Sequence, residues 1–199
     1  MRLSSFFLLI NRFFRTFENL MEDRKLLNSE LGRVSASGYA QLPPSGIVVV
    51  LDNIRSAHNV GSVFRSADAF QVDRIFLCGI CALPPSAEIH KSALGAEEVV
   101  PWNHFDDTLD AVGLLRSEGY EILSVEQTEK AVSLEKFRAE SGRKYALVLG
   151  NEVDGVRQDV VDASDATLVI PQWGTKHSLN VSVAAGVVLW ELKKQISEL

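Results

Sequence analysis

Continuous runs of apolar residues recur along the chain and predict strands that are buried on both faces. The clearest run covers residues 47–51 and reads Ile-Val-Val-Val-Leu. Uninterrupted β-branched runs of this length are typical of parallel sheets, whose two faces are both covered by helices. Similar runs lie near residues 72–78, 97–100, 120–125, 145–149 and 167–170. We therefore expect six strands.

Helical patterns lie between several of these runs. Residues 106–118 carry Leu109, Val112 and Leu115 at helical spacing, and Gly119 follows as a stop signal. Strands that alternate with helices along a chain are typical of α/β proteins. The pattern predicts an α/β fold with a mostly parallel six-stranded sheet and helices on both faces.

The first 45 residues differ in character from the rest of the chain. Residues 21–45 are polar and end in Leu-Pro-Pro-Ser-Gly, which is typical of a linker. We therefore expect residues 1–45 to form an N-terminal extension and linker, and residues 46–199 to form one domain.

Residues 6–20 are rich in phenylalanine and leucine but are interrupted by arginines. A transmembrane helix needs about twenty apolar residues, and a signal peptide needs a longer apolar region with a cleavage site. We therefore expect no integral membrane segment. The segment is either an amphipathic helix that docks on the domain, on a partner or on a membrane surface, or it precedes a true translation start at Met21.

The end of the chain has a helical pattern from about Ser178 to Ser197 that is apolar nearly all round between Val181 and Leu192. A helix of this kind is buried on most of its sides. Either it packs on the core with one side and on a second subunit with the other, or it is the central core helix of a monomer. We favour the first alternative, a homodimer through the C-terminal helix.

Composition narrows the functional classes only slightly. The chain of 199 residues has a net charge of −6, which argues mildly against nonspecific coating of nucleic acid but allows a basic patch on one face.

Its two cysteines, Cys78 and Cys81, are too few for a disulfide framework and fit a reducing, cytoplasmic location. They are either a redox pair or the buried end of a strand. Prolines follow at once instead of a helix, which favours the second alternative.

The first segment with candidate chemistry, residues 52–70, joins the first strand to a helix. Asn59 is a candidate N-cap of that helix. Arg65 lies off the apolar face and, taken alone, is a solvated surface charge. The apolar face, which we expect to pack on the sheet, consists of Val60, Phe64 and Ala67.

Two further segments each follow a buried strand. Residues 146–156 run from a strand into Gly150 and Glu152, at the strand end where ligands bind in open α/β sheets. The segment is either a ligand-binding loop or an ordinary strand-to-helix turn, and its spacing alone slightly favours the turn. In residues 168–182, a strand ends at a proline, a polar loop follows, and the last helix begins. Ser178 is either a plain N-cap or a site residue, and Asn180 is an amide that needs partners if it is buried.

Taken together, and in this order, the three segments resemble the motifs of the TrmH (SpoU) family of RNA ribose 2′-O-methyltransferases in the SPOUT superfamily. The resemblance covers residues 47–196. The matching stretches are Asn59-x-Gly61-x-x-x-Arg65, Leu149-Gly150-Asn151-Glu152-x-x-Gly155-Val156, and Ile170-Pro171 followed by Ser178-Leu179-Asn180-Val181-Ser182.

The resemblance implies a sheet whose C-terminal part forms a trefoil knot and holds a bent S-adenosyl-L-methionine without a metal. It also implies a homodimer with RNA spanning both subunits. Its cofactor-binding positions fall on the backbone at Leu149, Gly150, Ile170 and Leu179. Its active-site positions fall on Asn59, Arg65, Glu152, Ser178 and Asn180.

The expected mechanism needs in-line positioning and a less protonated 2′-oxygen. Arginine is an unusual base because it stays protonated, so we favour an electrostatic role for Arg65, with Glu152 and Asn180 orienting it. We expect tRNA as substrate first and rRNA second, and we interpret His177 as a loop residue. The candidate RNA contacts on the domain are Arg55, His58, Lys91 and Lys176.

Two other functional classes compete with this hypothesis. A non-catalytic RNA-binding protein with the same fold has no need of Arg65, Glu152 and Asn180 together. An oxidoreductase would use the two cysteines.

Overall fold

The computed structural model describes residues 24–198, so the segment expected at residues 6–20 lies outside the described residues. The chain divides into two compact units, residues 1–34 and residues 35–199. Within the described part of the first unit, a short 3-10 helix, η1 (Asn28–Glu30), is joined to Arg24 by an ion pair with Glu30. No described helix is both long enough and apolar enough to cross a bilayer.

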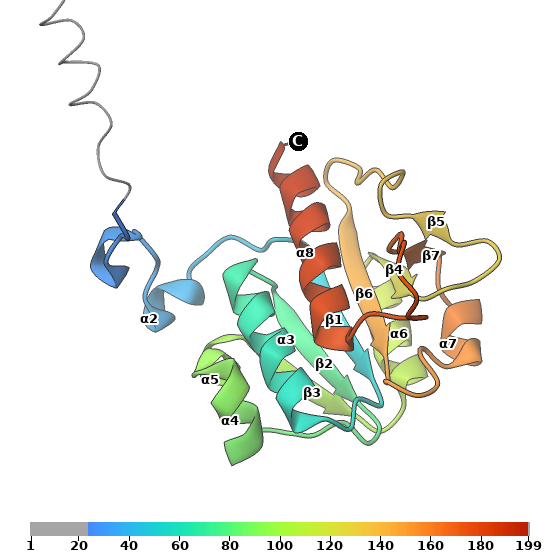
Figure 1. Cartoon of the computed structure of the whole chain (residues 1–199), viewed down its shortest axis with the longest axis horizontal. Coiled ribbons are helices and arrows are strands. Elements are labelled where there is room, and N and C mark those ends of the chain that lie inside the picture. The colour runs from blue at the N-terminus through green and yellow to red at the C-terminus, as the bar shows by residue number, and fades with distance from the viewer. Residues whose placement is uncertain (1–23, 199) are drawn as a thin grey trace, which may run out of the picture. The chain divides into compact units, whose positions relative to one another are not determined.

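The second unit is built on a seven-stranded sheet in the order β3-β2-β1-β6-β4-β7-β5, and the ladders between neighbouring strands are parallel (Figure 1). The strands are β1 (Ile47–Asp52), β2 (Arg74–Cys78), β3 (Trp102–Phe105), β4 (Tyr120–Val125), β5 (Val132–Ser133), β6 (Lys144–Gly150) and β7 (Ala166–Val169). The helices are α2 (Ala36–Tyr39), α3 (Ala57–Ala69), α4 (Ala87–Ala93), α5 (Ala96–Val99), α6 (Thr108–Ser117), α7 (Gln158–Asp162) and α8 (Val181–Glu198).

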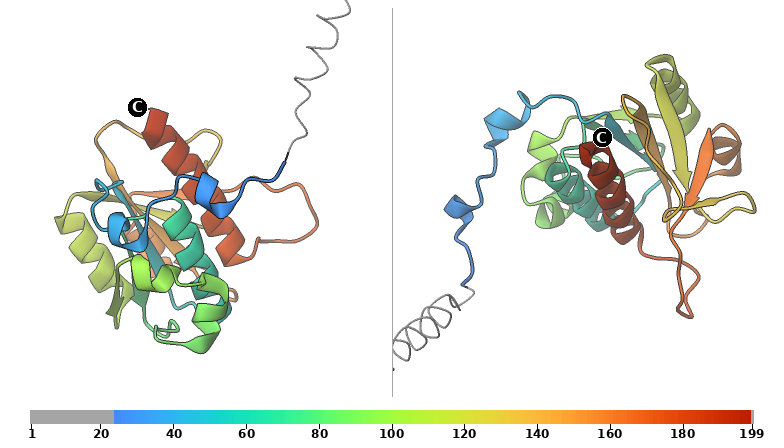
Figure 2. Two further views of the ribbon diagram at one scale, coloured as in Figure 1. Left: turned by 90° about the vertical axis from the view of Figure 1, so that its left-hand side faces the viewer. Right: turned by 90° about the horizontal axis from the view of Figure 1, so that it is seen from above.

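Helices cover both faces of the sheet, as Figures 1 and 2 show. Alternate residues of β1 point to opposite faces, so Val49 enters the core beneath α3 and α8, whereas Val48 and Val50 enter the core beneath α6 and α7. Both cores are fully buried at β1. The continuous apolar run in the sequence is therefore explained, and the predicted α/β architecture with a parallel sheet is confirmed.

The predicted strand positions need one correction. The run at residues 97–100 is not a strand: residues 96–99 form α5, and the strand β3 begins only at Trp102. Glu97 and Glu98 occupy the first turn of α5, where carboxylates favour a helix N-terminus. Strands β3 and β5 lie at the two edges of the sheet, where a strand needs no continuous apolar run, and they bring the total to seven instead of six.

Two helix starts also differ from expectation. Helix α3 is capped by Ser56, whose hydroxyl accepts the N–H of Asn59 at 3.2 Å, so Asn59 is not the N-cap and its side chain is available for other contacts. Helix α8 begins at Val181 and not at Ser178. The side-chain oxygen of Asn180 accepts the N–H of Ser182 at 2.9 Å, which satisfies a free donor of the first turn. The predicted α6, by contrast, is confirmed.

The segment before β1 is fixed to the domain. The Tyr39 hydroxyl donates to the carbonyl of Val72 at 2.8 Å, and the Asp73 carboxylate accepts the N–H groups of Ser45 and Gly46. These bonds lie within the second unit, which begins at Ser35.

Within this single chain, helix α8 is buried on one side only, so burial on most of its sides would need a partner on the other side. Its inner face packs beside α3 and consists of Val181, Ala185, Val188, Leu189 and Leu192. Its outer face exposes Val183 (51%), Val187 (37%) and Trp190 (60%). The helix is therefore not the central core helix of a monomer. An apolar helix face open to water favours a protein partner.

Candidate active site

A cavity of about 560 Å³ opens at the carboxyl ends of β4, β6 and β7. This is the edge of an open α/β sheet where ligands bind. The cavity walls come from residues 125–127, the loop after β6 (residues 150–155) and the segment between β7 and α8. Seven of the nine predicted cofactor-binding and active-site positions line it: Leu149, Gly150, Glu152, Ile170, Ser178, Leu179 and Asn180.

The loop after β6 folds back on itself. Asn151 and Gly155 exchange two backbone hydrogen bonds of 3.1 Å, and the Asn151 side chain accepts the N–H groups of Val153 and Asp154. A Cβ on Gly150 would overlap the backbone of Gly155, which itself has a positive φ of 69°. Gly150 is therefore required by the returning chain, whether or not the loop also binds a ligand.

One asparagine joins all three motifs. The Asn59 amide nitrogen on α3 donates to Glu152 Oε1 at 2.5 Å, and the Asn180 amide nitrogen donates to Asn59 Oδ1 at 3.1 Å. Asn59 is only 8% exposed, whereas its two partners are exposed. Residues from three distant parts of the sequence thus form one hydrogen-bonded junction at the rim of the cavity. The partners that Asn180 was expected to need are present, although Asn180 itself is not buried.

Arg65 lies apart from this junction. It follows Asn59 by six residues on α3 and is therefore displaced by about 9 Å along the helix axis. Its exposed side chain lines a separate groove of about 580 Å³ together with His58, Lys91 and Ser182. Within residues 24–198, the side chain of Arg65 forms no hydrogen bond or ion pair. Glu152 and Asn180 therefore bind Asn59 and not Arg65, in contrast to the orienting role that the sequence suggested.

The groove and the cavity meet at the start of α8. Asn180 lines the cavity, and Ser182, two residues later, lines the groove. Of the other candidate RNA contacts, Arg55 and Lys176 are exposed, and His177 lies in the cavity wall. A molecule in the cavity and a molecule held by the cationic side chains of the groove would thus lie next to each other.

The sequence did not single out three acidic or amide side chains that hold the cavity loops. Asp52, fully buried at the end of β1, accepts the N–H of Arg157 at 2.9 Å and the hydroxyl of Thr108 at 2.5 Å. Glu126 accepts the N–H of Val156 at 2.9 Å, and the Gln127 amide donates to the carbonyl of His177. The sequence signal that could have identified these side chains is their position, since each lies at or directly after the end of a buried strand.

The two cysteines do not form a reactive pair. Burial raises the pKa of the Cys78 thiol to about 12 and that of the Cys81 thiol to about 11. Cys81 also accepts the N–H of Ile54 at 3.1 Å and donates to the carbonyl of Leu51 at 3.2 Å. Thiols that stay protonated and buried are poor nucleophiles, so the structure favours the interpretation of Cys78 as a strand end.

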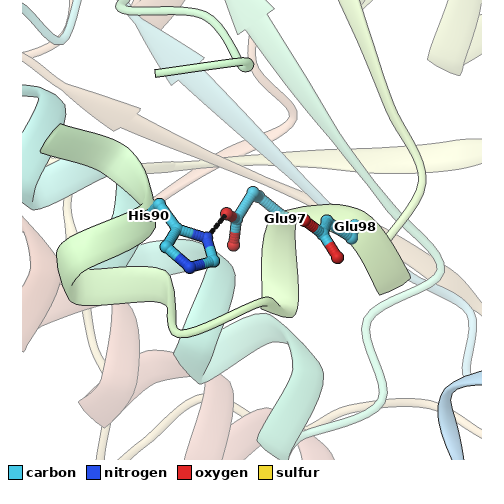
Figure 3. A group of neighbouring side chains, drawn as sticks. All are labelled: His90, Glu97 and Glu98. Atoms are coloured by element: carbon cyan, nitrogen blue, oxygen red, sulfur yellow. Dashed lines mark hydrogen bonds and ion pairs between the residues drawn. The ribbon is translucent and has the colours of Figure 1, made fainter. Parts of the chain in front are cut away.

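One group of potential metal ligands occurs within the described residues, and it lies away from the cavity. His90, at the end of α4, faces Glu97 and Glu98 in α5 (Figure 3). His90 Nδ1 lies 2.6 Å from Glu97 Oε1, and this hydrogen bond raises the pKa of His90. The pair links α4 to α5 across the turn between them. None of the three residues lines the cavity at β4, β6 and β7.

Comparison with known proteins places this geometry in a family. Residues 46–190 match the model of the SpoU rRNA Methylase family. The chain belongs to this family. The match includes Asn59, Arg65, Glu152 and Asn180.

Relatives in the SpoU family carry RNA methyltransferase names. The chain is 29% identical over 153 residues to the tRNA (guanosine(18)-2′-O)-methyltransferase of Aquifex aeolicus, covering 76% of this chain and 71% of that protein. It is 32% identical over 149 residues to the 23S rRNA (guanosine-2′-O-)-methyltransferase RlmB of Vibrio parahaemolyticus, covering 75% and 59%. The chain thus spans less than two thirds of the RlmB protein.

The fold has matching solved structures. The AdoMet-bound rRNA methyltransferase of Sinorhizobium meliloti superposes with a TM-score of 0.70 at 26% identity, over 76% of this chain and 60% of that one.

Proposed function

We infer that this chain is an S-adenosylmethionine-dependent RNA methyltransferase that acts on a ribose 2′-hydroxyl of tRNA or rRNA. The observation that carries the inference is the junction at Asn59, which brings all three SpoU motifs to one cavity. The names of the relatives support the reaction, and the AdoMet-bound neighbour supports the cofactor.

The cavity suits this cofactor in size and charge. Its volume of about 560 Å³ lies within the usual range for small-molecule sites. Three carboxylates line it, those of Glu126, Glu152 and Asp154, and among the described lining residues only His177 can carry a positive charge. S-adenosylmethionine supplies a methyl group activated by a positively charged sulfonium, which an acidic cavity favours. The backbone at Leu149, Gly150, Ile170 and Leu179 would hold it.

We further propose that the segment from β7 to α8 forms the trefoil knot of the SPOUT fold. Support comes from the family match and from the position of this segment beside the loop after β6. In this arrangement the loops of the second and third motifs enclose one ligand.

Arg65 is the proposed electrostatic group for the RNA. Its guanidinium carries a permanent positive charge, and its groove also holds Lys91 and His58. Such a cation can hold the phosphate beside the target ribose and stabilise the alkoxide that develops at the 2′-oxygen. Ser178 and Asn180 line the cofactor cavity, and Ser182 close by lines the groove, so Ser178 and Asn180 can position the ribose.

A homodimer through α8 completes the proposal. The outer face of α8 presents Val183, Val187 and Trp190 to water, and Val183 also lines the Arg65 groove. A second copy packed on this face would cover the apolar residues and lie next to the RNA groove. We place the enzyme in the cytoplasm, with tRNA as the first candidate substrate and rRNA as the second.

The deciding experiment combines methyl-labelled S-adenosylmethionine with total tRNA or rRNA and identifies the labelled nucleoside. A 2′-O-methylated nucleoside is expected. Transfer to a base instead of a ribose would refute the assignment, and cofactor binding without transfer to any RNA would favour the non-catalytic RNA-binding alternative.

Variants of Arg65 test its role. Arg65→Ala should lower turnover by about 10² to 10³, the usual effect of removing one transition-state donor. Because Arg65 is exposed, cofactor binding should be retained and the free energy of unfolding should change by less than about 0.5 kcal/mol. Arg65→Lys separates a simple charge, which keeps part of the activity, from a bidentate guanidinium contact, which does not. Arg138→Ala, an exposed arginine that binds only main-chain carbonyls, is the control. Near wild-type turnover in Arg65→Ala would refute the role.

A further inference from the structure

Within residues 24–198, the loop that forms one wall of the cofactor cavity is held by a single hydrogen bond. Residues 171–179 have no regular secondary structure, and most of them are exposed. In the described part of the chain, these nine residues take part in one hydrogen bond, from the Gln127 side chain to the carbonyl of His177. His177, Ser178 and Leu179 all line the cavity. The position of this wall therefore depends on Gln127.

The neighbouring residue holds the opposite wall. Glu126 Oε2 accepts the N–H of Val156 at 2.9 Å, and Glu126 Oε1 accepts the N–H of Gln127 at 2.8 Å. The same carboxylate packs directly on Gly155, where an added Cβ would overlap it. Gly155 and Glu126 both line the cavity. Glu126 thus fixes the end of the loop that follows β6.

We propose that Glu126 and Gln127, the two residues that follow β4, are positioning residues for the cofactor. Together they hold the two loops at a fixed separation before a ligand arrives. A loop that is ordered in the free protein loses less conformational entropy on binding, and this raises affinity. The proposal rests on the proposed function only for the identity of the ligand.

The first test measures affinity for S-adenosylmethionine and for its demethylated product by calorimetry. Gln127→Ala removes one neutral hydrogen bond and should weaken both ligands about three- to tenfold. Glu126→Ala removes charge-assisted bonds and should weaken them about 10- to 100-fold, with Glu126→Gln intermediate because it retains one acceptor. The matched controls are Gln158→Ala and Glu129→Ala, whose exposed side chains lie outside the cavity lining.

The two ligands distinguish positioning from direct contact. Because the loops enclose both ligands, a positioning role predicts equal losses for the cation and for its neutral product. A loss confined to S-adenosylmethionine would overturn the proposal in favour of direct charge contact, and unchanged affinity for both would also overturn it. In turnover assays the KM for the cofactor should rise while kcat at saturation is retained.

The second test needs no ligand and so remains valid if the proposed function fails. Lys176 is exposed and adjoins the anchored His177, so Gln127→Ala should accelerate trypsin cleavage after Lys176 but not after Lys130. Glu126→Ala should accelerate amide exchange at Val156. Wild-type cleavage and exchange rates in the variants would refute the anchoring. If the anchoring holds but wild-type protein binds neither ligand, the proposed function fails instead.

Discussion

The junction at Asn59 gives a sharp prediction for the substitution Asn59→Ala. The change deletes a 2.5 Å bond to the Glu152 carboxylate and a 3.1 Å bond from Asn180. A charge-assisted bond contributes about 1.5–3 kcal/mol and a neutral one about 0.5–1.5 kcal/mol. Because Glu152 and Asn180 are exposed and water can replace the lost partner, the lower end applies. We expect the free energy of unfolding to fall by about 2 kcal/mol.

Urea unfolding measures this loss, and calorimetry with S-adenosylmethionine measures its effect on the site. Affinity should fall as well, because Asn59 fixes residues from both cavity loops. Asn103→Ala, an exposed asparagine on the edge strand β3, is the control and should change neither quantity. Wild-type stability and affinity in Asn59→Ala would show that the three motifs are not coupled through this side chain.

The isosteric change Asn59→Asp tests the polarity of the junction. It removes the amide donor and places a second carboxylate beside Glu152, so at neutral pH it should destabilise more than alanine does. Lowering the pH protonates one carboxylate of the pair and restores a hydrogen bond. The stability deficit of Asn59→Asp should therefore shrink as the pH falls, whereas that of Asn59→Ala should not. Urea midpoints of both variants should be measured across about pH 4–8, the range in which neighbouring carboxylates titrate. If the midpoints of Asn59→Asp and Asn59→Ala change in parallel with pH, this reasoning is wrong.

Three further predictions follow from burial. If the proposed homodimer forms through α8, Val187→Glu should convert it to a folded monomer by light scattering, whereas Val188→Glu, at a fully buried position, should unfold the chain; a folded dimer in the first variant would argue against the α8 interface. Gly61→Ala should destabilise by about 1–3 kcal/mol, because the added methyl overlaps α4 and cannot be accommodated without shifts; an unchanged thermal midpoint would contradict this packing. Burial raises the pKa of Cys78 and Cys81, so the folded chain keeps protons that the unfolded chain releases. The contribution of the two thiols to the free energy of unfolding is complete below about pH 8.5 and falls above it by about 1.4 kcal/mol per pH unit per thiol. The double variant Cys78→Ala/Cys81→Ala should therefore lose less stability than the wild type between about pH 8.5 and 10.

Much of the fold follows from local sequence alone. The apolar run of β1 and the spacing of Leu109, Val112 and Leu115 predict a buried strand and helix α6, because burial on known faces imposes a period on the sequence. The order of the three motifs also identified the family. Edge strands were missed, since β3 and β5 bury too little to require an apolar pattern.

The arrangement of the site was decided by tertiary structure. Sequence spacing placed Asn59 and Arg65 on one helix, but it did not reveal that Asn59 meets Glu152 and Asn180 while Arg65 faces a different groove. It also did not indicate that Gln127 anchors the loop at residues 171–179. The sequence by itself determined which residues have the chemistry for this reaction and which strand ends carry them. Only the packed sheet decided which of them touch, because contacts between residues about a hundred positions apart depend on how strands are ordered, and local periodicity carries no information about that order.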